Sequence, residues 1–522
     1  MGELITLTGS NFGEMRDDSY ITIAGTSPTF SSYHTWQDNL IIVRVPELGE
    51  SGLVYVHSRG KKSNGVLFSN TAVLPKPVEG EAFGLEPRIT SVNPQTGVPG
   101  SIITINGINF GNSRDIDYLS TGGQTGGGVF FSWDFEAASF NPYVGREAEF
   151  IEVSETEFGY ESWSSREIRV RVPDGVVSGS LEVRTPNGIS RSVFFDVSGK
   201  PGTKTFREKR SYTINYSVDI RVLNATRPNN LYLWMPKPIT SSSQRNINPV
   251  SRNFDPFVEN YRGVSLFKLE NLTSGVNQSV NLSFYVEVYA VETEIRPLSI
   301  RQERSSIATS YTQNSNLIPS DDPEIKAVVN TIIGREQNPY IKGRMLYDWI
   351  INNIEINEIS FFPAPAGTSA AGLTSALEER QTDSCNAALL YAAMVRAAGL
   401  PCIPIAGILI NSNGQTIRHY WVEYWIDGFG WVPVDPAMGA GAVPYSYITK
   451  EDYFNYYYGN LDSNRIAFSR GELNLSQMES RGRVVYHTQS YSLQNIWEEA
   501  VGGLESYSSF WSDIIISGVY IQ

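Results

Sequence analysis

Residues 385–401 read CNAALLYAAMVRAAGLP, and this stretch decides the fold of the second half of the chain. Almost every residue after the cysteine is a helix former, and the closing Gly-Leu-Pro is typical of a helix end. The stretch predicts a helix that begins at Cys385, with Asp383 or Ser384 as its cap. A thiol in the first turn lies near unpaired backbone N–H groups and the positive end of the helix dipole, so we expect a thiolate.

A β-hairpin is predicted after this helix. Residues 419–426 read HYWVEYWI, a β-branched and aromatic composition typical of a strand. A DGFG turn and a second strand follow, and the second strand ends at Asp435. His419 and Asp435 share a face of the hairpin only if the turn has an odd length or a bulge interrupts a strand. Pro433 is the expected place for a bulge, because proline cannot donate to the ladder.

Together these segments predict a Cys-His-Asp catalytic triad. In such a triad Cys385 is the nucleophile, His419 is the base, and Asp435 orients the imidazole. Simpler interpretations compete with this one, since a lone cysteine in a helix is usually a small buried hydrophobic residue and a lone histidine a partnered polar residue. The chain has only four histidines, however, and one of them falls at the required position.

The three motifs, in this order and spacing, resemble the core of the transglutaminase-like superfamily. The resemblance extends from Asp322 to about Asn474, roughly a third of the chain. It implies an α+β, papain-like cysteine catalytic core in which the same three residues do the chemistry. Two positions depart from the family pattern: Asp383 stands where the family often has Gly, and Ile403 where it often has Arg. Neither departure removes a catalytic group, although both could alter the substrate cleft.

An oxyanion hole can be assigned in part. The backbone N–H of Cys385 is a candidate donor because it is free at a helix start. The side-chain candidates are Gln381, Asn386 and Trp349, and the last lies in an amphipathic helical stretch that is more typical of a core. Cys402 begins an apolar strand and is expected to pack, although a disulfide with Cys385 would silence the nucleophile. The chemistry requires no cofactor, and no metal ligands are assigned; the sequence does not decide whether an ion is needed.

The first two hundred residues contain an internal repeat. Residues 7–13, LTGSNFG, match residues 105–111, INGINFG, and residues 36–46 match residues 163–173 at the same internal spacing. Such a repeat of short strands and glycine turns predicts two tandem β-sandwiches. Both copies resemble immunoglobulin-like IPT/TIG domains. The first copy lacks the opening strand that the second has at 87–100, and we attribute this to truncation of an N-terminal leader.

The second copy carries an insertion. The segment between Gly111 and Trp163 is 29 residues longer than that between Gly13 and Trp36. It is either a binding loop, for example for a carbohydrate, or a surface hairpin that packs on its own aromatic residues. Its glycines lack a following Lys and Ser or Thr, so a phosphate-binding loop is not expected. The insertion includes the glycine-rich run 122–128 and the aromatic residues Phe130, Phe131, Trp133 and Phe135.

Alternating patterns at 212–222, 231–234 and 280–291 predict a third β-sandwich. The predicted fold is therefore multidomain, with N-terminal all-β immunoglobulin-like sandwiches before an α+β papain-like and transglutaminase-like core. The predicted domains are 1–80 and 84–199 (IPT/TIG-like), 203–300 (third sandwich), 301–475 (catalytic core) and 476–522 (C-terminal β extension).

Composition limits the function. The chain has 41 basic and 55 acidic residues, a net charge of −14, which argues against nucleic acid as a partner. No apolar run is long enough to span a bilayer. Two cysteines exclude a disulfide scaffold. We expect an exported protein at the cell surface, in the periplasm or outside the cell, with its leader absent from this chain.

The predicted reaction is acyl transfer from a protein or peptide amide through a thioester. A lysine amine as acceptor would make the enzyme a transglutaminase, and water would make it a cysteine peptidase or a deamidase. The alternative from another class is a non-catalytic cell-surface adhesin or binding scaffold. The expected partners are a protein or peptide substrate and, for the β-sandwiches, a cell-surface or extracellular protein or glycan.

Overall fold

A computed structural model of the chain describes two compact units, residues 1–84 and residues 85–522. The glycines at 122–126, Phe135 and residues 301–310 of the predicted linker lie outside the described residues. The described ranges are 3–46, 52–68, 86–112, 114, 127–133, 149–153, 159–261, 263–300, 311–357, 370–486 and 490–521.

The first unit is a small β-sandwich. One sheet has the strand order β1-β4-β3, and the other has the order β2-β5-β6 with β7 paired to β5. Alternate residues of β2 and β4, among them Ile21, Ile23 and Ile41, are fully buried between the sheets, because successive side chains of a strand point to opposite faces. The strands are β1 Leu4–Thr8, β2 Tyr20–Ile23, β3 Tyr33–Gln37, β4 Leu40–Arg44, β5 Gly52–Ser58, β6 Lys61–Lys62 and β7 Val66–Phe68.

The second unit begins with another sandwich, which confirms the predicted pair of β domains. In the first copy the indole of Trp36 donates to the carbonyl of Phe12 at 3.1 Å, and in the second copy Trp163 donates to Phe110 at 3.1 Å. The sheets have the orders β12-β13-β9-β8 and β11-β10-β14-β15, with β16 paired to β14. The strands are β8 Arg88–Asn93, β9 Ile102–Ile108, β10 Gly128–Trp133, β11 Glu149–Glu152, β12 Tyr160–Trp163, β13 Glu167–Arg171, β14 Gly179–Thr185, β15 Gly188–Ile189 and β16 Val193–Phe195.

The aromatic residues of the insertion do not form a separate binding loop where the structure describes them. β10 pairs with β14 of the sandwich, so Phe131 and Trp133 point inward and are buried. Phe130 faces outward under the guanidinium of Arg184, 4.0 Å from the ring centre. The expected packing of the insertion on its own aromatics is therefore wrong for Phe131 and Trp133, because both pack into the surrounding core.

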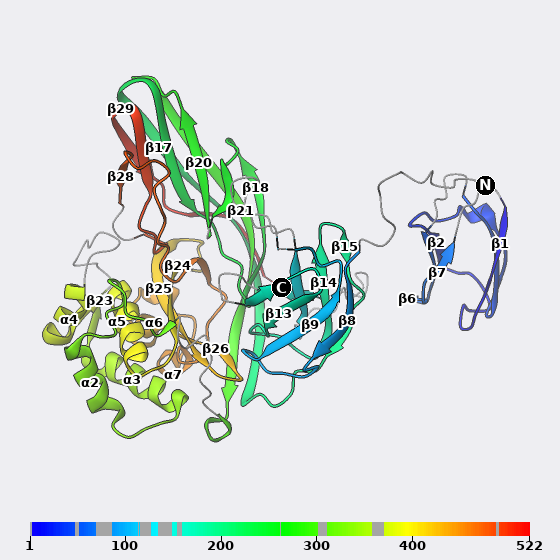
Figure 1. Cartoon of the computed structure of the whole chain (residues 1–522), viewed down its shortest axis with the longest axis horizontal. Coiled ribbons are helices and arrows are strands. Elements are labelled where there is room, and N and C mark those ends of the chain that lie inside the picture. The colour runs from blue at the N-terminus through cyan, green and yellow to red at the C-terminus, as the bar shows by residue number, and fades with distance from the viewer. Residues whose placement is uncertain are drawn as a thin grey trace. The chain divides into compact units, whose positions relative to one another are not determined.

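A large sheet of eight strands follows (Figure 1). The predicted strands at 212–222 and 231–234 are parts of one long strand, β17, interrupted by register shifts rather than by a turn. β29 and β30 both pair with β17, so the predicted C-terminal extension completes this sheet. The predicted domain boundaries stay predictions. The strands are β17 Gly202–Pro236, β18 Gln244–Arg252, β19 Val258–Tyr261, β20 Val264–Glu270, β21 Asn277–Ile295, β28 Arg483–Val485, β29 Glu498–Trp511 and β30 Ile515–Ile521.

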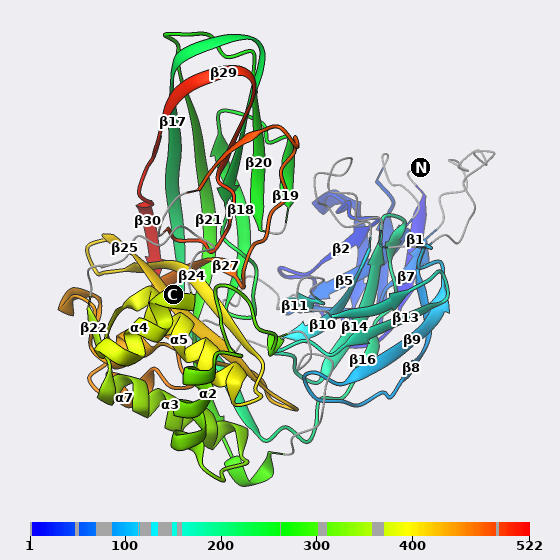
Figure 2. The same ribbon diagram turned by 60° about the vertical axis from the view of Figure 1, so that its left-hand side comes forward.

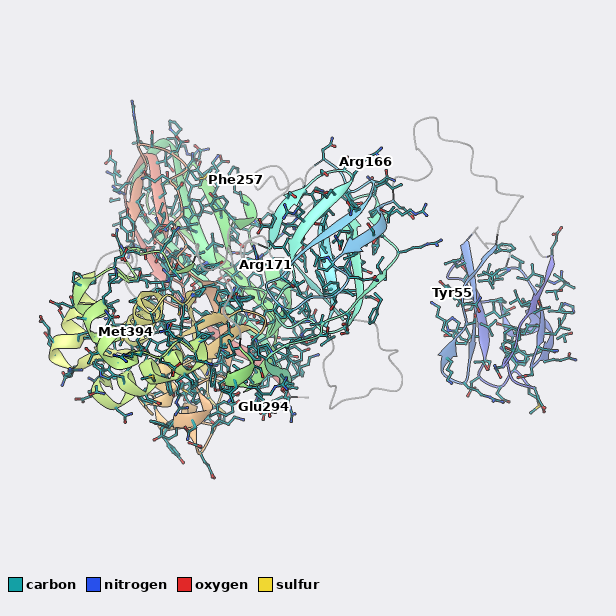
Figure 3. All side chains as sticks on the ribbon, turned by 60° about the horizontal axis from the view of Figure 1, so that its bottom comes forward. Tyr55, Arg166, Arg171, Phe257, Glu294 and Met394 are labelled. Carbon is teal, nitrogen blue, oxygen red and sulfur yellow. The ribbon has the colours of Figure 1, made fainter. Side chains whose placement is uncertain are left out.

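The predicted catalytic core has a four-stranded sheet of order β26-β25-β24-β27, with helices against one face (Figure 2). Tyr420, Val422 and Tyr424 of β25 pack on α5, whose interior residues, Met394 among them, are buried (Figure 3). Trp421 points to the opposite face, into a second cluster. The elements are α2 Pro323–Ile333, α3 Pro339–Asn353, β22 Glu355–Asn357, α4 Ala370–Glu379, β23 Gln381–Asp383, α5 Ser384–Ala397, β24 Cys402–Ile410, β25 Thr416–Ile426, β26 Gly430–Val434, α6 Pro436–Gly439, α7 Tyr453–Tyr456 and β27 Arg465–Arg470.

The hairpin of β25 and β26 meets the geometric condition for His419 and Asp435. Ile426 pairs with Gly430, which leaves a turn of odd length between them. The register continues without a shift through Pro433, so the bulge expected there is absent. Because Val422 pairs with Val434, the next position on β26 lies opposite residue 421 and on the face of residue 419.

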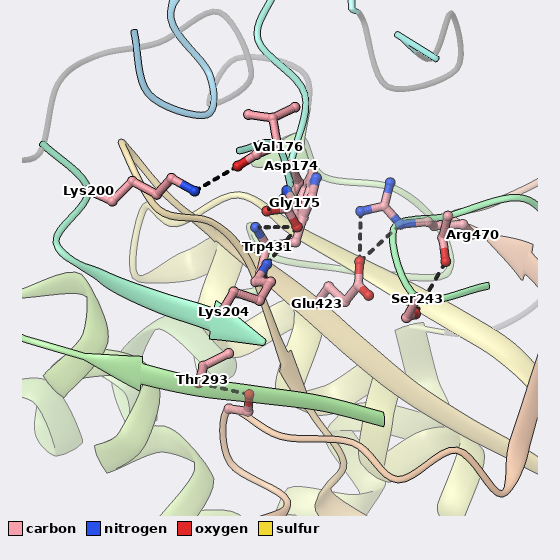
Figure 4. A network of polar contacts seen from close by, with 12 residues as sticks. Asp174, Gly175, Val176, Lys200, Lys204, Ser243, Thr293, Glu423, Trp431 and Arg470 are labelled. Carbon is pink, nitrogen blue, oxygen red and sulfur yellow. Dashed lines mark hydrogen bonds and ion pairs between the residues drawn. The ribbon is translucent and has the colours of Figure 1, made fainter. Parts of the chain in front are cut away.

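A buried ion pair holds the tip of this hairpin (Figure 4). Lys204 of β17 donates to Asp174 Oδ2 at 2.6 Å and to the carbonyl oxygen of Trp431 at 2.5 Å. A Cβ on Gly430 would lie 2.1 Å from Asp174 Oδ1, so the close approach requires glycine. The strand that leads to Asp435 is therefore tied to both the second sandwich and the large sheet.

Gly407 is expected to be intolerant of even a methyl group. It pairs with His419 on one side and with Ala467 of β27 on the other, and a Cβ would lie 2.0 Å from the Ile466 carbonyl oxygen. Gly407→Ala should lower the free energy of unfolding by about 1–3 kcal/mol, because the two strands must separate. Urea unfolding measures this effect. Gly518→Ala is the matched control, since its Cβ would meet Thr213 at an ordinary 3.5 Å; equal losses in both variants would contradict the expectation.

Candidate active site

Cys385 lies in the first turn of α5, as predicted, and is half-buried. Asp383 is the cap: its Oδ1 accepts the backbone N–H of Asn386 at 2.7 Å. The predicted thiolate is not supported by this environment. Burial raises the pKa of the Cys385 thiol well above its usual value, the Asp383 carboxylate raises it further, and a hydrogen bond with Tyr420 lowers it. The negative charge at the cap opposes the effect of the helix dipole on the pKa of the thiol.

His419 and Asp435 are in direct contact inside the protein. The two side chains are 1% and 0% exposed, and His419 Nε2 lies 2.8 Å from Asp435 Oδ2 and 3.0 Å from Oδ1. Asp435 also caps α6, since its Oδ1 accepts the backbone N–H of Met438 at 3.0 Å. With Nε2 occupied by the carboxylate, Nδ1 of the imidazole is the nitrogen left to exchange a proton with a reacting group.

Three polar residues that the sequence interpretation missed complete this cluster. Arg465, the first residue of β27, donates to Asp435 Oδ2 at 2.8 Å and to Asp462 Oδ2 at 3.1 Å. Tyr457 donates its hydroxyl to Asp462 Oδ2 at 2.6 Å. The signal in the sequence is an arginine at the start of a strand whose next three residues are apolar.

Asp435 and Asp462 should make stability sensitive to acid. Burial opposes their ionisation, but His419 and Arg465 beside Asp435, and Arg465 and Tyr457 beside Asp462, lower the pKa of both carboxyls. A lowered folded-state pKa contributes stability above the unfolded pKa of about 3.9, and this contribution is lost as pH falls through the folded value.

Urea unfolding at about pH 6 and about pH 3 measures how much the free energy of unfolding falls between the two pH values. The fall should be larger in the wild-type protein than in Asp462→Asn, by about 1 kcal/mol or more. Identical losses in the two proteins would show that Asp462 is not ionised in the folded state.

The structure joins two of the three predicted catalytic residues. α5 packs on β25, and Tyr420 reaches from β25 to the Cys385 thiol. His419 precedes Tyr420 in the sequence and lies on the same face of the sheet as Trp421. The indole ring of Trp421 stacks on the imidazole, with the ring centroids 6.3 Å apart. Although both residues are described, no hydrogen bond joins Cys385 to His419. β26 ends at Val434, opposite Val422, so it does not extend along β25 as far as His419. His419 therefore lies beside the start of α6.

The three oxyanion side-chain candidates have other contacts in this structure. Gln381 is exposed and donates to Glu355 Oε2 at 3.2 Å. Asn386 Nδ2 donates to Asp383 Oδ2 at 3.3 Å. Trp349 packs against the helical core with the guanidinium of Arg380 4.9 Å from its ring centre, as its amphipathic setting predicted. The backbone N–H of Cys385 stays the stronger candidate, because it belongs to the unpaired first turn of a helix.

Cys402 is a packing residue, as predicted. It is fully buried in the core between α5 and the sheet, and neither cysteine forms a disulfide. Burial raises the pKa of its thiol to about 12.

Across the described ranges, no group of three or more His, Cys, Asp or Glu is arranged to hold a metal ion. Likewise, none of the helices in the described part of the chain has the length and apolar character needed to cross a bilayer.

Comparison with known families confirms both resemblances. Residues 326–436 match the model of the transglutaminase-like superfamily, and residues 1–72 and 87–129 match that of the IPT/TIG domain. The chain thus contains a transglutaminase-like core preceded by IPT/TIG domains.

The individual proteins that are similar to this chain have low sequence identity to it. An uncharacterized protein of Haemophilus influenzae is 27% identical over 174 residues, which cover 28% of this chain and 46% of that protein, so the chain spans about half of its length. A candidate cysteine protease from Cytophaga hutchinsonii has 16% identity and a TM-score of 0.37, over 61% of this chain and 93% of that one. The periplasmic domain of TgpA from Pseudomonas aeruginosa has 15% identity and a TM-score of 0.27, over 48% and 92%. Such TM-scores are too low to assign a function.

Proposed function

We propose that this protein is a cysteine-dependent enzyme that transfers the acyl group of a protein or peptide amide through a thioester on Cys385. One observation carries the proposal: His419, which forms a fully buried pair with Asp435, lies on β25, the strand against which the Cys385 helix packs. Burying an ionised carboxylate is costly unless it has partners, and an imidazole held by such a carboxylate is suited to move protons. The match to the superfamily supports the same reaction class.

The raised pKa of the Cys385 thiol favours a first step in which proton transfer accompanies attack. Cys385 gives its proton to Nδ1 of His419 while its sulfur attacks the amide carbonyl. A thiolate therefore does not have to form before the substrate binds. The imidazolium, held by Asp435, then protonates the leaving amine and the C–N bond breaks. The first proton transfer, from Cys385 to His419, requires the thiol to turn from Tyr420 toward the imidazole. The backbone N–H of Cys385 stabilises the oxyanion.

The acceptor that ends the reaction names the enzyme. A primary amine would form a new amide and make the enzyme a transglutaminase, whereas water would release an acid and make it a peptidase or deamidase. We propose that the protein acts outside the cytoplasm, and that the IPT/TIG domains bind a cell-surface or extracellular protein or glycan.

Selective alkylation tests the nucleophile. The folded protein carries two thiols, and Cys402 provides an internal reference because it is fully buried. Iodoacetamide should label Cys385, with a rate that falls in His419→Gln at neutral pH, while Cys402 reacts only after unfolding. Peptide mass spectrometry identifies the labelled cysteine. Equal rates in the wild-type protein and in His419→Gln would overturn the proposed pair.

A glutamine-containing peptide then distinguishes the reactions. Incorporation of a fluorescent primary amine identifies a transglutaminase, release of ammonia alone a deamidase, and cleavage of the chain a peptidase. A protein with an unresponsive thiol and none of these products would instead fit the non-catalytic binding scaffold.

A further inference from the structure

A buried polar cluster continues from the His419–Asp435 pair toward β27, beyond the residues that match the transglutaminase-like core. Arg465 contributes its guanidinium to this cluster and is only 3% exposed. Its Nη1 lies 2.8 Å from Asp435 Oδ2, and its Nη2 lies 3.1 Å from Asp462 Oδ2. The two terminal nitrogens of one rigid group therefore join two carboxylates.

We infer that Arg465 is a positioning residue, which acts through Asp435 to set the orientation of the His419 imidazole for the proposed acyl transfer. The inference deepens the proposed function and rests on it. Arg465 itself does not contact the reacting atoms.

The hydrogen bonds of Asp435 explain why one arginine can fix the imidazole. Oδ1 of Asp435 accepts the backbone N–H of Met438 at 3.0 Å, and Oδ2 accepts Arg465 at 2.8 Å. With a fixed donor on each oxygen, the plane of the carboxylate cannot rotate without breaking a buried bond. His419 Nε2 contacts both oxygens, at 2.8 and 3.0 Å, so the carboxylate plane determines where the ring points.

A second contact leads from Arg465 to the same imidazole. The guanidinium carbon lies 5.0 Å from the ring centre of Trp421, and Trp421 stacks on His419 with an angle of 22° between the rings. Arg465 therefore supports both of the groups that bracket the imidazole, the carboxylate at its Nε2 and the indole at its face.

Arg465 is itself held in place. Asp462 accepts the Tyr457 hydroxyl at 2.6 Å and the backbone N–H of Asn464 at 2.8 Å, which leaves its carboxylate aimed at Arg465. A buried ion network of this kind is weak evidence for stability, because apolar residues of similar volume often serve stability equally well. Its position behind the imidazole is what indicates a role in orientation.

Arg470 is a matched control on the same strand. It forms a part-buried ion pair with Glu423, at 3.0 Å from Nε and 2.7 Å from Nη2 (Figure 4). Arg465→Met and Arg470→Met each remove one guanidinium while keeping an unbranched side chain. A difference between them reports the bond to Asp435 rather than the loss of a buried charge.

The experiment reads His419 directly and then the reaction. Proton NMR of the full chain follows the proton that lies between His419 Nε2 and Asp435, assigned by its loss in His419→Gln. We expect this resonance to shift or broaden in Arg465→Met and to stay unchanged in Arg470→Met. Turnover of the amide substrate should fall about 10- to 100-fold in Arg465→Met, as for other partners that orient a functional residue. The acid limb of the pH profile of turnover should move to higher pH. Arg465→Lys should recover part of both effects.

The double variant Arg465→Met with Asp462→Asn guards against loss of the fold, because it removes one positive and one negative charge together. An unchanged resonance and acid limb in a folded Arg465→Met or double variant would overturn the inference, whatever the turnover. An inactive wild-type protein would overturn the proposed function instead. In that case a shifted resonance would still support the role of Arg465 in orienting His419.

Discussion

Replacing Cys385 with alanine is expected to abolish amide turnover while leaving the fold intact. The loss should be on the order of 10⁵- to 10⁶-fold, the size seen when the nucleophile of a triad is removed. The side chain is small and half-buried at the border of the helical core, so the free energy of unfolding should change by less than about 1 kcal/mol. Steady-state turnover of a glutamine-containing peptide and urea unfolding measure the two effects.

Cys402→Ala should show the opposite pattern. Its thiol is fully buried in the core, so a small cavity should lower stability by about 1–2 kcal/mol while turnover per folded molecule is kept. If Cys385→Ala retained turnover, or if Cys402→Ala lost it without unfolding, the assignment of the nucleophile would be wrong.

Asp435→Asn should lose both activity and stability. The carboxylate is 0% exposed and accepts from His419, Arg465 and the Met438 backbone. The amide of the Asp435→Asn variant would turn an N–H toward one of these donors, and Arg465 would keep only Asp462 as an ionised partner. Breaking this buried network should cost about 3–5 kcal/mol. Turnover should fall about 10⁴-fold, as expected when a triad carboxylate no longer fixes the tautomer of its histidine.

Glu423→Gln separates the two losses. It breaks the buried ion pair with Arg470 on the same sheet and should therefore destabilise the protein without lowering turnover per folded molecule. Thermal unfolding measures the stability of Asp435→Asn and of Glu423→Gln. Turnover of each variant is then measured below its own unfolding temperature. Asp435→Asn with normal turnover in its folded fraction would remove Asp435 from the mechanism.

Local sequence was sufficient for the elements and for part of the site. The helix formers after Cys385 predicted α5 and the Asp383 cap, because helix propensity and capping act over a few residues. The aromatic and β-branched run from His419 predicted β25, and the family models confirmed the two resemblances. The repeat in the first two hundred residues predicted two sandwiches, since each copy carries its own alternating pattern and turns.

Local patterns were insufficient wherever strands from distant parts of the chain meet. The length of β17 and its pairing with β29 and β30 depend on partners nearly three hundred residues away, and a two-residue period does not name a partner. The same limit explains the aromatic residues of the insertion, which appear as a loop in sequence but join the sandwich core through β14.

The sequence by itself determined the candidates for the proposed chemistry: a cysteine at a helix start, a histidine on a strand and an aspartate at the next strand end. Only the tertiary structure decided their electrostatic state, since that depends on burial and on charges brought from elsewhere. Burial and Asp383 raise the pKa of the Cys385 thiol, and Arg465, from a strand thirty residues beyond Asp435, holds the carboxylate that contacts His419. Charges act through space, so a pattern read along the chain cannot show which of them will be neighbours.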